Sequence, residues 1–189
     1  QMCIRDRYAL ASHFSLCNAH GTYTGDVIDS TNSDSRDTDA DGQTLTVSSV
    51  RTGSSEGSGT AGTVGAALTG TYGQLTLNAN GSYTYVANQD LADALDVGDM
   101  VTESFNYTVS DGSGGTDIAV ITITIMGVND TPVADDETNS VNVSSTLTVT
   151  DGTSDVLHGD TDADASSSLT VTGIRTGQEG GSGTAGTVG

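Results

Sequence analysis

The sequence predicts an all-β protein built as a sandwich of two antiparallel sheets, and two observations carry this prediction. Apolar and polar residues alternate with a period of two in several short stretches, which is the pattern of a half-buried strand. Glycine-rich turns separate these stretches, and only residues 91–95 show a helical spacing, for a single turn. Short strands joined by such turns favour a two-sheet sandwich.

The first predicted pair of strands stands on either side of a turn signal. Leu75 and Leu77 alternate with polar residues before the turn, and Tyr83 and Tyr85 alternate after it. The dipeptide between them, Asn80-Gly81, is typical of a type I′ turn. We therefore expect a β-hairpin with the leucines and tyrosines at core positions.

A second hairpin is predicted from residues 101–109 and 117–126, which a run of Asp, Gly and Ser joins. Its first strand carries one charged residue on the apolar face, Glu103, in line with Phe105 and Tyr107. A carboxylate at such a position is costly without a partner. Glu103 is therefore expected either to bind a ligand or to lie at a sandwich edge that is open to water.

The chain repeats itself, since residues 38–65 return almost unchanged at residues 161–189. The repeat predicts a first unit at residues 21–131 and the truncated start of a second at residues 132–189, within a longer array whose units pack on their neighbours. Residues 1–20 lack the composition rich in Thr, Gly and Asp that the rest of the chain has, and we interpret them as a non-native segment.

The charge balance limits the classes of partner. The chain has five basic residues, all arginine, and 25 acidic ones, which gives a net charge of −20. Such a chain repels nucleic-acid phosphates and anionic membranes, so we expect no nucleic-acid partner. No apolar run is long enough for membrane insertion. Cations are the expected partners.

Two aspartate clusters have a spacing suited to calcium. Residues 37–42 read Asp-Thr-Asp-Ala-Asp-Gly, and residues 160–164 repeat the first five of these letters. Alternate aspartates direct several hard oxygens to one point, as calcium requires. The clusters are not EF-hands, because the twelfth position from Asp37 is Ser48 and no helix flanks it. The alternative is a solvated acidic turn. The candidate ligands in these clusters are Asp37, Asp39, Asp41, Asp160, Asp162 and Asp164.

We expect no catalytic activity. The three histidines have no Ser, Cys or carboxylate partner at a recognisable spacing. The two cysteines, Cys3 and Cys17, form neither a disulfide framework nor a zinc motif.

The order of the motifs resembles a known family. Residues 103–112, Glu-Ser-Phe-Asn-Tyr-Thr-Val-Ser-Asp-Gly, are followed by a Val/Ile/Thr strand and by Asn129-Asp130-Thr131-Pro132. This resembles the second half of a cadherin repeat, and with the aspartate cluster before it residues 70–132 are similar to the VCBS repeats of large bacterial adhesins. The resemblance implies tandem immunoglobulin-like or cadherin-like Greek-key sandwiches, at the cell surface or secreted.

The resemblance also implies a set of calcium ligands at the junction between two repeats. Carried over residue by residue, these are Glu103, Asn129, Asp130, Asp160 and Asp162, with Asp111 and Asp164 as further ligands.

The predicted function is that of a calcium-binding extracellular spacer or adhesive module, serving cell adhesion or biofilm formation. The expected partners are calcium ions, neighbouring repeats of the same chain, and cell-surface glycans or proteins. The alternatives are a carbohydrate- or ligand-binding module and an accessory domain of a secreted hydrolase. The core-like spacing of the aromatic residues favours the spacer.

Overall fold

The computed structural model describes residues 21–28, 37–150, 152, 155–177 and 182–188. The chain divides into two compact units, Gln1–Asn129 and Asp130–Gly189, and each is described by itself. The expectation that residues 1–20 are non-native lies outside the described residues. In the described part, no helix has the length and apolar character needed to cross a membrane.

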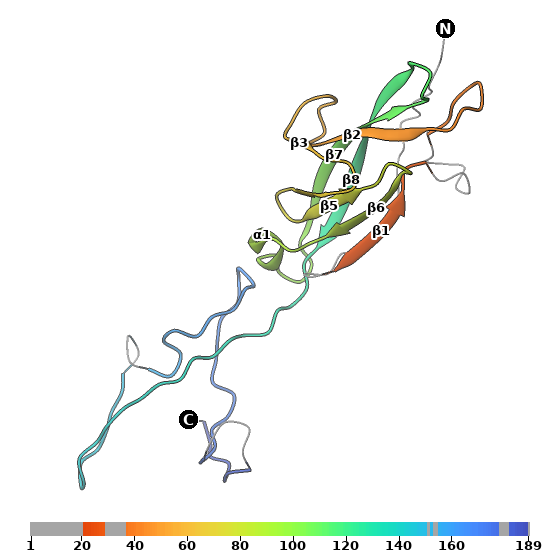
Figure 1. Ribbon diagram of the computed structural model, residues 1–189. Helices are drawn as coiled ribbons and strands as arrows, with labels where there is room; N and C mark the ends of the chain where they lie inside the picture. Colours follow the sequence, from red (N-terminus) through yellow and green to blue (C-terminus); the bar gives the residue numbers. More distant parts are fainter. Residues whose placement is uncertain (1–20, 29–36, 151, 153–154, 178–181, 189) are drawn as a thin grey trace. The chain divides into compact units, whose positions relative to one another are not determined.

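The first unit contains two four-stranded antiparallel sheets (Figure 1). One sheet has the order β1-β6-β5-β4, from Thr22–Asp26 (β1), Ser82–Val86 (β6), Gln74–Leu77 (β5) and Ala67–Thr69 (β4). The other has the order β3-β2-β7-β8, from Ala61–Gly62 (β3), Thr46–Thr52 (β2), Met100–Ser110 (β7) and Thr116–Met126 (β8). One helical turn, α1, spans Asp90–Asp93. The predicted all-β sandwich is confirmed.

The core lies between the two sheets and uses the predicted apolar faces. Leu75, Leu77 and Tyr85 of one sheet and Phe105 of the other are fully buried. The rings of Tyr85 and Phe105 meet edge to face across the sheets, with centroids 6.2 Å apart. Such aromatic pairs stabilise a core beyond the area they bury. The alternation in the sequence therefore identified the inward side chains correctly.

The β5–β6 hairpin is confirmed, but its turn differs from the predicted type. Gly81 has a φ of 93°, whereas Asn80 is not among the residues with positive φ, so the turn is not type I′. The amide of Gly81 donates to the carbonyl of Asn78, and the amide of Asn78 donates to the carbonyl of Ser82. This is the arrangement of a three-residue loop with a left-handed glycine at its end.

The β7–β8 hairpin is also confirmed. The two strands pair without interruption from Met100↔Met126 to Ser110↔Thr116. At the turn, Asp111 Oδ1 accepts hydrogen bonds from the amides of Ser113 (2.8 Å) and Gly115 (2.9 Å). The side chain of Asp111 therefore shapes the turn that the glycines permit.

The glycine-rich segment after β2 is partly a strand. Here β2 pairs with the short strand β3 through Val50↔Gly62 and Arg51↔Ala61. The guanidinium of Arg51 donates to the carbonyl of Gly59 (3.1 Å). These contacts fix the loop at its base.

The second unit repeats this hairpin on a small scale. Arg175 and Ala185 form an antiparallel bridge, and the guanidinium of Arg175 donates to the carbonyl of Gly183 (3.4 Å). A second bridge joins Val133 and Thr161. The repeated sequence thus adopts the same local hydrogen bonding in both units.

Candidate metal centre

The first aspartate cluster lies in the loop that precedes β2. Asp39 Oδ1 accepts hydrogen bonds from the amides of Asp41 (2.8 Å) and Gln43 (3.1 Å). The other oxygen, Oδ2, is buried and has no hydrogen-bond donor among the described residues. Asp37 Oδ2 accepts a hydrogen bond from the hydroxyl of Tyr107 (2.9 Å), which ties the loop to β7.

Asp111 belongs to the same end of the sheet. It follows Ser110, the last residue of β7, which pairs with Thr46 at the start of β2. Its side chain is only 6% exposed. Oδ1 holds the turn, whereas the buried Oδ2 has no donor in the described part of the chain. Asp111 therefore presents a charged oxygen that nothing described neutralises.

In the second unit, the structure connects three of the predicted ligands. Asp164 is 7% exposed, and its Oδ2 accepts a hydrogen bond from the amide of Asp130 (2.9 Å). The amide of Asp164 in turn donates to Asp162 Oδ1 (2.9 Å). Asp164 Oδ1 is buried, and none of the described residues donates to it. Asp130, Asp162 and Asp164 thus form one hydrogen-bonded group.

Asp160 joins a different acidic group with two residues that sequence reasoning missed. Oxygens of Asp135, Glu137 and Asp160 all lie within 4.8 Å of one another. Asp160 Oδ1 also accepts a hydrogen bond from the amide of Asp135 (3.0 Å). The bridge between Val133 and Thr161 brings the segments together. The signal in the sequence was the acidic run at residues 135–137.

The electrostatics of this second group are unfavourable without a cation. The pKa of Glu137 is raised above its usual range, first by desolvation and then by the negative charges of Asp135 and Asp160. A group whose neighbours disfavour its charged form attracts either a proton or a metal ion.

Glu103 has partners within the first unit. The carboxylate is 8% exposed and accepts hydrogen bonds from the amide of Thr71, the amide of Tyr72 (3.4 Å) and the hydroxyl of Tyr85 (2.6 Å). These donors belong to the other sheet and its β4–β5 turn. The apolar face predicted for Glu103 is confirmed, and its burial is compensated by three donors. Asn129, the remaining predicted ligand, is exposed at the end of the first unit.

The donor sets fit calcium. The side chains in question offer only oxygen, and calcium takes about six to eight oxygen ligands from carboxylates, carbonyls and water. Buried carboxylate oxygens without a donor occur at Asp39, Asp111 and Asp164 among the described residues. A bound cation offsets the free-energy cost of burying such a charged oxygen.

A curated relative from Rhizobium johnstonii, described as the calcium-binding lectin RapA2, is 41% identical to this chain over 80 residues. The match covers 40% of this chain and 32% of the relative. The chain therefore spans about a third of the length of the relative that it matches.

The family comparison covers the sandwich itself. Residues 14–127, more than half of the chain, match a model of the bacterial cadherin-like domain. The match spans every strand of the two sheets described above. The resemblance to cadherin repeats that the sequence motifs indicated is thereby confirmed. The chain belongs to the bacterial cadherin-like domain family.

Proposed function

We propose that this chain is a calcium-binding module of an extracellular or cell-surface adhesion protein. Three observations support the proposal: the cadherin-like family, the similarity to a protein described as a calcium-binding lectin, and the buried carboxylate oxygens of both units. In this proposal the module binds calcium and serves either adhesion or spacing. Its units follow one another along a longer protein.

The observation that carries the proposal is the carboxylate of Asp164. One oxygen is held by the amide of Asp130, and the other is buried without a donor among the described residues. An ionised oxygen in that position is unfavourable unless a cation neutralises it. Asp162, which accepts from the amide of Asp164, is positioned to supply a further ligand.

The acidic group around Asp160 supports a second ion. Three carboxylates converge there, and calcium would replace their mutual repulsion with shared coordination. In the first unit, the loop of Asp37, Asp39 and Asp41 corresponds in sequence to the segment from Asp160 to Asp164. We propose that this loop and Asp111 bind calcium at the matching end of β2 and β7.

Isothermal titration of the chelator-treated chain with calcium tests the proposal. Wild type should bind calcium, and Asp164→Asn should weaken binding at one site about tenfold because a charged ligand is lost. Asp99→Asn serves as the control, since Asp99 is exposed and is not among the proposed calcium ligands. Absence of calcium binding by wild type, or equal binding by Asp164→Asn, would contradict the proposal.

A further inference from the structure

We propose that a cavity in the first unit binds a short neutral glycan through threonine hydroxyls and the carboxylate of Glu103. The inference rests on the adhesive role proposed above and adds to it a ligand class and a site. It is independent of the calcium sites proposed above, because Glu103, the acidic residue that lines this cavity, is not among the ligands proposed for those sites.

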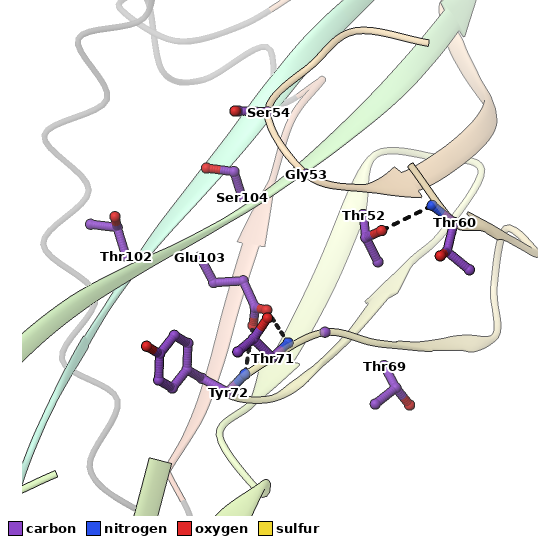
Figure 2. Close-up of a pocket in the computed structure, with 11 residues that line it drawn as sticks. Thr52, Gly53, Ser54, Thr60, Thr69, Thr71, Tyr72, Thr102, Glu103 and Ser104 are labelled. Atoms are coloured by element: carbon purple, nitrogen blue, oxygen red, sulfur yellow. Dashed lines mark hydrogen bonds between the residues drawn. The ribbon is translucent and has the colours of Figure 1, made fainter. Parts of the chain in front are cut away.

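The cavity has a volume of about 610 Å³ and lies where the two sheets approach each other (Figure 2). The end of β2 and the middle of β7 line it from one sheet, and the β4–β5 turn lines it from the other. Pockets that bind small ligands commonly measure about 300–1,000 Å³. The space is therefore large enough for a short oligosaccharide segment.

The chemistry of the lining favours a ligand with many hydroxyl groups. Apart from Thr102 and Ser104 of β7, most of the side chains that line it are Ser or Thr, whose hydroxyls both donate and accept hydrogen bonds; these are Thr52, Ser54, Thr60, Thr69 and Thr71. None of the described residues that line the cavity is basic, and the chain carries a net charge of −20. An anionic ligand is therefore repelled. An apolar ligand finds little to contact, because Tyr72 provides the lining's single aromatic ring.

Glu103 supplies a fixed acceptor inside this cavity. Its carboxylate points toward the β4–β5 turn, whereas the side chains of Thr102 and Ser104 point to the other side of β7 (Figure 2). The amides of Thr71 and Tyr72 and the hydroxyl of Tyr85 hold it in place. A carboxylate has about four lone-pair positions, so about one remains to accept from a sugar hydroxyl.

The neighbouring glycine is part of the same arrangement. A Cβ added at Gly70 would overlap the carboxylate of Glu103. The turn therefore lets the carboxylate approach the backbone closely. Because its donors are already in place, Glu103 needs no reorganisation to meet a ligand, and such preorganisation lowers the cost of binding.

The test uses the full chain with ¹⁵N labelling and three neutral probes: maltotriose, cellotriose and mannotriose. At least one should shift the amide resonances of Thr71 and Tyr72, in calcium and in chelator alike. The double variant Thr60→Val, Thr71→Val should weaken that binding about tenfold, since two hydrogen-bonding hydroxyls are lost. Both threonines are exposed, so the isosteric change should leave the fold intact.

The matched control is Thr24→Val, an exposed position on β1 at the opposite edge of the sheet from β4. It should bind the probe as wild type does. The inference is overturned if no neutral probe shifts these amides at up to about 10 mM, a weak-binding limit. Unchanged affinity in the double variant, or tighter binding of trigalacturonate, would overturn it too. Calcium titration of the same samples tests the proposed calcium sites separately from the proposed glycan site.

Discussion

At the scale of single residues, two buried polar side chains of β7 show how this sandwich combines a polar sequence with a closed interior. Glu103 faces the core, where the hydroxyl of Tyr85 and two amides of the β4–β5 turn donate hydrogen bonds to it. Asn106 lies on the outer face, yet it is 1% exposed because the loop after β2 covers it. Buried polar groups that are hydrogen-bonded in this way help to specify one arrangement of the chain.

Asn106 is therefore expected to be a major determinant of stability. Its Nδ2 donates to the carbonyls of Gly53 (3.0 Å) and Ser58 (3.1 Å), and its Oδ1 accepts from the amide of Gly57 (3.1 Å). Asn106→Ala should lower the free energy of unfolding by about 2–3 kcal/mol, since it leaves buried partners unsatisfied. Urea denaturation measures the change.

The control for this prediction is Asn88→Ala, because Asn88 is exposed. Its effect should stay within about 0.5 kcal/mol. Equal losses in the two variants would mean that the network around Asn106 contributes nothing of its own.

The sequence could place these two residues on faces but could not supply their partners. Alternation along residues 101–109 predicts which side of the strand each side chain occupies. The amide donors to Glu103 lie 32 and 31 residues away, and the donor to Asn106 lies 49 residues away. Contacts of that separation depend on how the sheets pack, which local periodicity does not encode.

At the scale of elements, the long hairpins could be predicted and the short edge strands could not. Each strand of the β7–β8 pair has 11 residues, enough for the alternation to be unmistakable. By contrast β3 has two residues and β4 has three, so neither shows a period. The group of Asp135, Glu137 and Asp160 was missed for a related reason, since a single bridge rather than a strand joins its segments.

The β2–β3 hairpin offers a matched pair of glycines for a test. Gly53 and Gly59 both have a φ of 91°, but an added Cβ meets nothing within 4 Å at Gly53 and overlaps the carbonyl of Thr52 at Gly59. Gly53→Ala should cost about 1 kcal/mol for the left-handed backbone. Gly59→Ala should cost about 3 kcal/mol, because the overlap must also be relieved. Thermal denaturation compares them, and equal costs would show that the loop does not close as described.

At the scale of the whole molecule, the large negative charge of the chain affects the stability of the fold. A net charge of −20 opposes a compact state, and the acidic groups concentrate part of that charge at a few points. A ligand that binds only the folded chain stabilises it by mass action. Calcium is therefore expected to act on stability as well as on adhesion.

The stabilisation by calcium should depend on pH. The raised pKa of Glu137 means that the folded chain takes up this proton more readily than the unfolded chain. Without calcium, that contribution favours the fold at acidic pH and is lost as the pH rises through the raised pKa. Calcium binds the deprotonated group, so its effect on Tm should be largest near neutral pH and should fall as the pH drops through the raised pKa of Glu137.

Scanning calorimetry in calcium and in chelator across this range measures the effect. Sodium chloride at matched ionic strength is the control, since it screens charge without coordinating carboxylates. If sodium chloride raises Tm as much as calcium does, the stabilisation comes from screening and not from bound ions.

The repeated hairpin has a consequence for how the chain folds. Arg51 and Arg175 each bond a carbonyl eight residues further along the chain. Contacts of such short separation close rapidly, well before pairings between distant strands. Each hairpin can therefore form from its own segment before it meets the nearly identical copy. In a chain of similar repeats, this early local closure protects against exchange of segments between neighbours, which is a common route to misassembly.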